Sequence, residues 1–226
     1  MQTTKYNFEA HGQVWRVMYD ESISTLLVEM RDPEKKEVSF AALNLYSGDV
    51  LWEGLQMDES WWVTMAGVKD GMLYFTHFAP DNRMPTVQKL QKLDILQALI
   101  IEDNVEDPKD ISSAKDVSSP VIYPIDSEHH ATLKKFLESK DIQVADSDIH
   151  YMETTSEIIF AYLVKNEEKL QRKILICDVE GNIIFKDAMD SVVNEQIMDS
   201  FFVIDKMLLY IKEKEILCGL PLDKTI

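Results

Sequence analysis

The chain has 226 residues, of which 46% are hydrophobic, so it is long enough to form one globular domain or two small ones. Its 40 Asp and Glu residues outnumber 23 Lys and Arg residues and give a net charge of −17 at pH 7. A negative field of this size repels phosphate backbones and anionic lipids, so we expect neither nucleic acid nor a membrane surface as a partner.

The sequence also bears on the compartment. The N-terminal segment MQTTKYNFEAHG has no basic region followed by an apolar run, and the longest apolar run, Leu96 to Ile101, is interrupted by Gln97. These features predict neither a secretory signal nor a membrane-spanning helix. Cys177 and Cys218 lie in separate apolar runs, which favours buried free thiols over a disulfide framework. We expect a cytoplasmic protein.

Short β-forming segments follow one another along the chain and are separated by turn clusters such as Ser47-Gly48-Asp49. The predicted strands are Thr25 to Met30, Val38 to Tyr46, Val50 to Trp52, Met72 to Phe78, Val87 to Ile95, Ile158 to Val164, Leu170 to Val179, Asn182 to Lys186, Phe201 to Ile204, Met207 to Lys212 and Glu215 to Leu220.

The middle of the chain has a different pattern. Residues 102–119 are acidic and nearly free of aromatic side chains, which predicts a long exposed loop. After it, Leu133, Phe136 and Leu137 fall on one helical face, so a short helix is expected near residues 128–138.

One strand-turn-strand pattern recurs. Asn44 to Trp52 aligns with Asp178 to Phe185, and Leu93 to Ile100 is a third copy that has lost its glycine. We therefore predict equivalent turns at Gly48 and Gly181, both with positive φ. The recurrence defines five units of about four strands, the last of them completed by an N-terminal strand. Their ranges are 14–56, 61–103, 104–147 (degenerate), 149–189, and 198–222 with 5–9.

Repeated four-stranded units are typical of propeller blades. The sequence thus predicts a single all-β domain, a five-bladed β-propeller-like fold with one short inserted helix. A sandwich or a split barrel is the alternative. To close the ring, residues 5–9 should pair with the strand at Glu215 to Leu220, because otherwise the last blade has an open edge.

The segment FAALNLYSGDVLW resembles the strand-turn-strand of quinoprotein-type propeller repeats. The whole chain resembles an uncharacterised bacterial family of unknown function with propeller-like organisation, best over Val14 to Ile95. The resemblance implies the fold and no activity. Quinone enzymes of this type have an adjacent cysteine pair and a calcium site, which this sequence lacks, so we expect no cofactor.

The pair Trp61-Trp62 is the most distinctive candidate for ligand binding. We expect the pair on a strand, where adjacent side chains point to opposite faces, so that one indole packs between sheets and the other reaches a channel or groove and stacks on a flat ligand. His77 belongs to the same predicted site. The alternative is that both indoles pack in the core, as similarly placed aromatics elsewhere in the repeats suggest.

Catalytic and metal-binding patterns are weak. Asp58, Glu59 and His77 could act as acid–base groups of a hydrolase or lyase on a carbohydrate-like neutral substrate. The five histidines show no metal-ligand spacing, and Asp146-Ser147-Asp148 lacks the rest of a calcium loop, so no metal is expected. We expect a non-catalytic scaffold that binds an unknown protein or a small neutral ligand.

Overall fold

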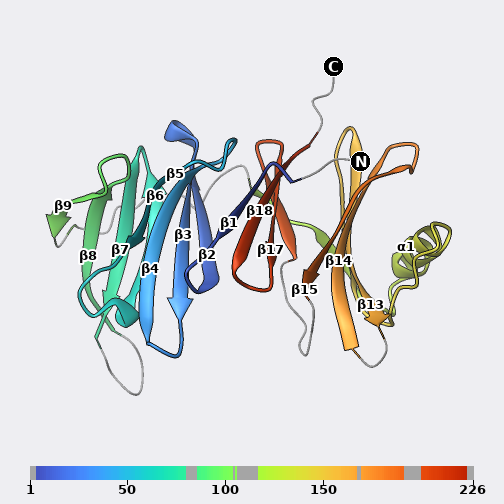
Figure 1. Ribbon diagram of the computed structural model, residues 1–226, viewed down its shortest axis with the longest axis horizontal. Coiled ribbons are helices and arrows are strands. Elements are labelled where there is room, and N and C mark those ends of the chain that lie inside the picture. The colour runs from blue at the N-terminus through green and yellow to red at the C-terminus, as the bar shows by residue number, and fades with distance from the viewer. Residues whose placement is uncertain are drawn as a thin grey trace. The chain divides into compact units, whose positions relative to one another are not determined.

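The computed structural model describes residues 4–79, 86–103, 105, 117–166, 169–190 and 200–222. These residues form eighteen β-strands, one α-helix and two short 3-10 helices, so the predicted all-β class with one short helix is confirmed (Figure 1). The chain divides into two compact units, residues 8–116 and residues 1–7 with 117–226, and each is described by itself.

Residues 8–116 contain two four-stranded antiparallel sheets in which sheet order follows chain order. This is expected where short turns join neighbouring strands, because such strands can pair directly. The first sheet consists of β2 (Gln13–Asp20), β3 (Thr25–Asp32), β4 (Glu37–Asn44) and β5 (Val50–Leu55). The second consists of β6 (Val63–Lys69), β7 (Met72–Phe78), β8 (Val87–Asp94) and β9 (Leu99–Asp103). The 3-10 helix η1 (Glu21–Ile23) joins β2 to β3, and η2 (Ser60–Trp62) precedes β6.

Both sheets of this unit contribute to one hydrophobic core. Side chains alternate along a strand, so Val38 and Phe40 of β4 point to the same face and meet Leu73 and Phe75 of β7 in that core. The rings of Phe40 and Phe75 pack edge to face with centroids 4.6 Å apart. These contacts hold the two sheets together and thereby fix the side chains that lie between them.

The other unit contains two five-stranded sheets. One consists of β11 (Val121–Tyr123), β12 (Ile149–Glu153), β13 (Glu157–Asn166), β14 (Lys169–Asp178) and β15 (Ile183–Asp190). The second has the order β1 (Tyr6–Glu9), β18 (Ile216–Pro221), β17 (Met207–Lys212), β16 (Phe201–Ile204) and β10 (Val117–Ser118).

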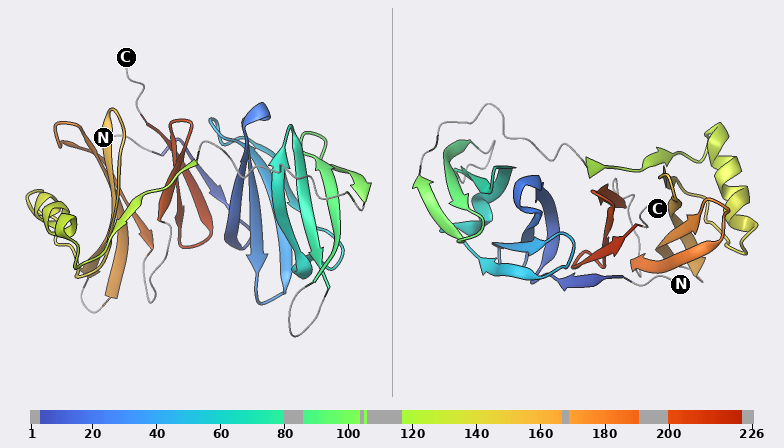
Figure 2. Two further views of the ribbon diagram at one scale, coloured as in Figure 1. Left: turned by 180° about the vertical axis from the view of Figure 1, so that it is seen from behind. Right: turned by 90° about the horizontal axis from the view of Figure 1, so that it is seen from above.

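The helix α1 (Glu128–Glu138) lies where the apolar spacing predicts it. Ser127 caps its N-terminus, since the Ser127 hydroxyl accepts a hydrogen bond from the His130 backbone N–H at 3.3 Å. Its apolar face covers one face of the sheet β11–β15 (Figures 1 and 2), where Leu137 is fully buried and Phe136 stacks on Phe160 of β13.

The N-terminal strand pairs as predicted. β1 is the edge strand beside β18, and the backbone N–H of Lys5 donates to the carbonyl of Gly219 at 2.8 Å. The ring of Tyr6 lies so close to Gly219 that any side chain at position 219 would overlap it. Residues from the two ends of the chain therefore share one sheet.

The aligned turns share a residue with positive φ but differ in length, since the Gly48 N–H donates to the Asn44 carbonyl, four residues earlier, and the Gly181 N–H donates to the Asp178 carbonyl, three residues earlier. Gly48 and Gly181 have φ of 76° and 83°, as predicted, and Ala98 takes the corresponding place in the third copy with φ of 52°. The polar residue that starts each copy caps its turn, because Asn44, Asp94 and Asp178 each accept hydrogen bonds from backbone N–H groups that follow. The left-handed conformation thus persists where the glycine is lost.

The predictions for the middle of the chain need correction. Residues 102–103 belong to β9 and residues 117–118 to β10, so the predicted loop 102–119 is shorter at both ends; its positions 104 and 106–116 lie outside the described residues. Within the described part of the unit 104–147, β10 and β11 join neighbouring sheets as edge strands and form no sheet of their own. Five blades remain a prediction.

Candidate functional site

The predicted acid–base residues occupy different environments. Asp58 and Glu59 are exposed ahead of η2, whereas His77 is only 7% exposed and lies in β7 opposite Val63 of β6. A general acid or base must reach a substrate, so a buried imidazole and two solvated carboxylates are a poor basis for catalysis.

The expectation that Trp61 and Trp62 lie on a strand is wrong. Both belong to η2, which begins after Glu59 in the left-handed region at φ of 51°, and the Trp62 backbone N–H donates to the Glu59 carbonyl at 3.0 Å. The two side chains therefore do not alternate between sheet faces. Both are half-buried, and Trp61 packs against the core shared by the two sheets.

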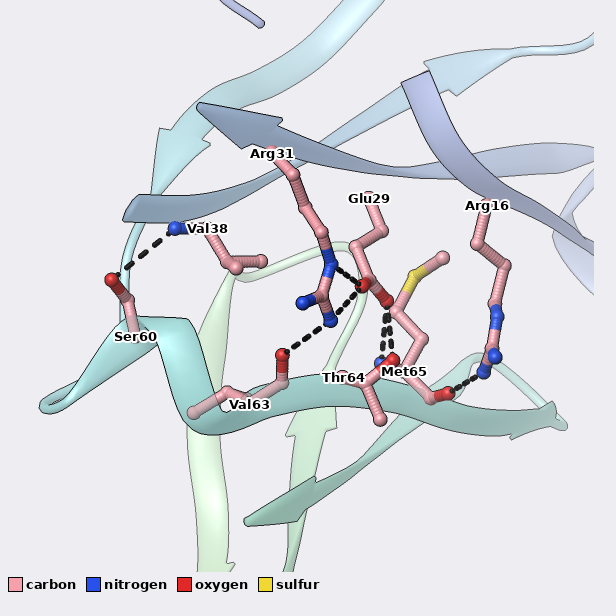
Figure 3. A network of polar contacts seen from close by, with 8 residues as sticks. All are labelled: Arg16, Glu29, Arg31, Val38, Ser60, Val63, Thr64 and Met65. Carbon is pink, nitrogen blue, oxygen red and sulfur yellow. Dashed lines mark hydrogen bonds and ion pairs between the residues drawn. The ribbon is translucent and has the colours of Figure 1, made fainter. Parts of the chain in front are cut away.

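A buried carboxylate links the two sheets of residues 8–116 (Figure 3). The Glu29 side chain of β3 is fully buried and accepts hydrogen bonds from Arg31 Nε at 2.9 Å and Arg31 Nη2 at 2.7 Å. It also accepts from the Thr64 hydroxyl at 2.8 Å and the Met65 backbone N–H at 2.9 Å, both on β6. These bonds offset the cost of burying the charge and fix the position of Arg31.

The guanidinium of Arg31 lies against two tryptophan rings. Its central carbon is 5.1 Å from the ring centroid of Trp15 and 5.5 Å from that of Trp61, both within cation–π range. Arg31 Nη2 additionally donates to the Val63 carbonyl at 3.3 Å. We call Trp15, Arg31 and Trp61 the Trp15–Arg31 surface.

Trp15 is exposed because of a local irregularity in β2. The register between β2 and β3 shifts between Val14 and Arg16, which makes Trp15 the extra residue of a β-bulge. A bulge re-aims the side chain of its extra residue. Trp15 is 60% exposed, an unusual exposure for the residue with the largest apolar side chain, while its neighbour Arg31 is held in place against its ring.

The guanidinium groups of Arg31 and Arg16 each have N–H groups that make no hydrogen bond among the described residues. Among the interactions of the described residues, Arg31 Nη1 makes no hydrogen bond, and the Arg31 side chain is 18% exposed. Arg16 lies opposite Glu29 in the β2–β3 ladder and donates through Nη1 to the Met65 carbonyl at 2.5 Å. The exposed indole and these donors could accept a ring-shaped ligand with an oxygen acceptor at its edge.

Other polar pairs lie in the second unit. The Ser200 hydroxyl lies 2.8 Å from His150 Nδ1, but the two residues are only 4% and 7% exposed, so a substrate could not reach this pair as it stands. The Tyr210 hydroxyl donates to Asp187 at 2.7 Å, and Lys212 Nζ donates to the same carboxylate at 2.9 Å. Burial raises the pKa of Tyr210 and raises that of the neighbouring Cys218 thiol to about 11, so both stay protonated at neutral pH.

The described residues contain neither a metal-binding cluster nor a membrane-spanning helix. No group of three or more His, Cys, Asp or Glu side chains in the described ranges is arranged to hold a metal ion. Within the same ranges, no helix is both long and apolar enough to cross a membrane.

Sequence reasoning found Trp61 but missed its partners. Trp15 is visible as an aromatic residue ahead of the first predicted strand, Thr25 to Met30, yet no local pattern indicates the bulge that exposes it. Arg31 stands beside Asp32 and Pro33 and has the appearance of an ordinary turn residue. Its role depends on η2 and β6, which follow some thirty residues later, as the Arg31–Val63 contact across a separation of 32 shows.

Comparison with known proteins gives one partial match. Residues 19–101 match a family model described as a domain of unknown function, DUF4905. The matched range runs from the end of β2 into β9, so it includes Arg31 and Trp61 and excludes Trp15. No curated protein matches the sequence. The chain is thus similar to this family over β3 to β8 and the adjoining ends of β2 and β9.

Proposed function

We propose that the chain is a non-catalytic binding protein whose ligand contacts the Trp15–Arg31 surface. The observation that supports this most is the 60% exposed indole of Trp15 beside a guanidinium held rigidly by Glu29. A fixed platform binds with a small loss of conformational entropy, because the groups that meet the ligand are already in place. Trp61 stays in the predicted site, Trp15 joins it, and the buried His77 leaves it.

A non-catalytic role is favoured over a hydrolase or lyase. Asp58 and Glu59 are exposed and His77 is buried, so these three groups share no environment in which their acidities could be tuned against each other. The Ser200–His150 pair does share an environment, but it is buried, so a substrate could not reach it as it stands.

We also propose that the four sheets are blades of a propeller-like fold in a cytoplasmic protein. Three of the five predicted units, 14–56, 61–103 and 149–189, coincide closely with sheets that run in chain order, and the unit 198–222 is completed by β1 beside β18. Crystallography of the intact chain tests this arrangement, since blades require the sheets to be placed radially about one axis.

The binding function is tested with soluble oligosaccharides. Tryptophan fluorescence is followed while trigalacturonate or galactotriose is added to the wild type, to Trp15→Ala, and to Leu51→Ala, which removes a different exposed apolar side chain. We expect saturable quenching in the wild type and Leu51→Ala that is lost in Trp15→Ala. The mixtures are then analysed for cleavage products. Turnover that His77→Ala abolishes would contradict the non-catalytic function and support the hydrolase or lyase.

A further inference from the structure

We infer that the Trp15–Arg31 surface recognises an acidic saccharide, with a sugar ring on the Trp15 indole and its carboxylate on Arg31 Nη1. This inference rests on the proposed function and adds the ligand class. It replaces the expected neutral ligand by an acidic one. A neutral ligand was expected because the chain as a whole is strongly negative.

The donors of Arg31 lead to the carboxylate. A guanidinium has five N–H donors in a planar fork, and here Nε and Nη2 are committed to Glu29 and the Val63 carbonyl. The two N–H groups of Nη1 remain, on a side chain that is 18% exposed and cannot turn away without breaking those bonds. A guanidinium binds a carboxylate more strongly than it binds the hydroxyl or ring oxygens of a sugar, because the hydrogen bonds to a carboxylate are charge-assisted.

Arg16 adds a second positive group to the same sheet face. Arg16 and Glu29 are ladder partners, and Arg31 lies two residues beyond Glu29, so all three side chains share a face of the sheet. Arg16 is exposed, and only its Nη1 is engaged, with the Met65 carbonyl. Two arginines against one buried carboxylate leave this face locally positive.

The net charge of −17 does not oppose a single carboxylate here. At physiological ionic strength, charges more than about 8 Å away are largely screened, so the distant acidic residues oppose a carboxylate here only weakly. A phosphate is a weaker candidate because it is usually bound by backbone N–H groups, whereas β6 presents the carbonyls of Val63 and Met65 at this place.

A cationic ligand is excluded because Arg31 already occupies the place that a cation would take between the two tryptophan rings. Two tryptophans around a cation form the arrangement that recognises ammonium groups, but Arg31 itself fills it. What stays open is the outer part of the Trp15 indole. The apolar C–H face of a pyranose ring fits such a surface, since it can lie flat on an indole while its substituents reach the edge.

Calorimetry with matched ligands tests the ligand class. Trigalacturonate is compared with its fully methyl-esterified form, which keeps the rings and removes the charges, and with uridine monophosphate. We expect the acid to bind the wild type at least about tenfold more tightly than the ester, because charge-assisted hydrogen bonds outweigh neutral ones. The ratio should fall at about 0.5 M NaCl, where screening is stronger.

Two variants assign the effect to Arg31. Arg31→Lys keeps the charge but loses the planar fork, so the ratio of acid to ester affinity should drop several-fold. The double variant Glu29→Gln, Arg31→Gln replaces the buried ion pair by a neutral pair, and in a sample with native circular dichroism the ratio should fall several-fold, to what Arg16 alone supports. Retention of the full ratio in this folded double variant would overturn the inference.

The outcomes separate the inference from the proposed function. If acid and ester bind equally and both lose affinity in Trp15→Ala, the binding function stands and the ligand class is wrong. If uridine monophosphate binds more tightly than trigalacturonate, the binding function stands and the assignment of an acidic saccharide is wrong. If none of the ligands binds and Trp15→Ala changes nothing, the proposed function fails together with the inference.

Discussion

Each compact unit contains a group made of an aromatic ring, a carboxylate and a cation. The ring is the exposed member in one unit, and the charged side chains are the exposed members in the other. In residues 8–116 the Glu29 side chain is fully buried and the Trp15 ring is 60% exposed. In the other unit Tyr210 is fully buried, whereas the side chains of Lys212 and Asp187 are 29% and 25% exposed. The first arrangement hides the ion pair and presents the ring; the second hides the ring and leaves the ions near solvent. A group of the second kind can stabilise a fold, but only the first offers a ring to a ligand.

Removing the cation from each group should give the largest contrast. Arg31→Ala leaves the Glu29 carboxylate buried without its charge partner and should lower the free energy of unfolding by about 3–5 kcal/mol. Lys212→Ala breaks a partly exposed pair and should cost about 1 kcal/mol or less. Urea unfolding of both variants checks this. Equal losses would show that the two ion pairs do not differ in the way their burial indicates.

High pH should affect the tyrosine group through Cys218. Burial raises the pKa of this thiol from 9.0 to about 11, so the folded state keeps a proton that the unfolded state loses. The resulting stabilisation is complete below pH 9.0 and disappears as the pH rises to about 11, with a loss of about 1 kcal/mol by pH 10.

Urea unfolding of the wild type and of Cys218→Ala, each from pH 8 to pH 10, measures this loss. The variant should show a smaller decrease, because it lacks the group whose pKa burial raises. Parallel decreases in the two proteins would contradict the assignment to Cys218.

Substitutions in the aligned turns should change the free energy of unfolding by similar amounts in the two units. Gly48→Ala should cost about 1 kcal/mol because φ is positive. Gly181→Ala should cost more, since its added Cβ would lie 3.3 Å from Phe136 Cε2 of α1. Ala98→Gly should instead stabilise the fold by up to about 1 kcal/mol, because φ of 52° is unfavourable for alanine. Thermal unfolding of the three variants checks both signs; destabilisation by Ala98→Gly would show that the turn tolerates alanine without strain.

Much of the fold was predictable because it depends on local patterns. The strands Met72 to Phe78, Phe201 to Ile204 and Met207 to Lys212 have the predicted bounds, and the turn at Gly48 follows from its own residues. The helix also follows from apolar spacing within one segment.

The candidate site was less predictable because it depends on contacts between distant segments. The exposure of Trp15 comes from a register shift between two strands, and the position of Arg31 is fixed by groups on β6. Likewise, Glu59 has a left-handed backbone although it is not a glycine, and the 3-10 helix that contains Trp61 and Trp62 begins directly after it. The sequence gives no signal for this conformation. Such features appear only once the strands are paired.

Removing the exposed ring should have the smallest effect on stability. Trp15→Ala loses a solvent-exposed cation–π contact, so we expect a cost below about 1 kcal/mol together with a loss of ligand binding. Tyr210→Phe, its counterpart in the other unit, removes the hydrogen bond to Asp187 and should cost about 1 kcal/mol without affecting binding. Chemical unfolding and calorimetry on the same samples measure both quantities. A large loss of stability in Trp15→Ala would assign the ring to the structure and not to a ligand.

The central claim, that a ligand meets Trp15 over Arg31, is tested most directly by the indole N–H signals of the four tryptophans in a nitrogen-15 correlation spectrum. Trigalacturonate is added in steps, and single Trp→Phe variants assign the signals. The Trp52 indole, which donates to the Ile95 carbonyl at 2.6 Å, serves as the internal reference. We predict that the Trp15 signal shifts most, the Trp61 signal shifts less, and the Trp52 signal stays in place. A spectrum without shifts, or one in which Trp52 moves and Trp15 does not, would contradict this account.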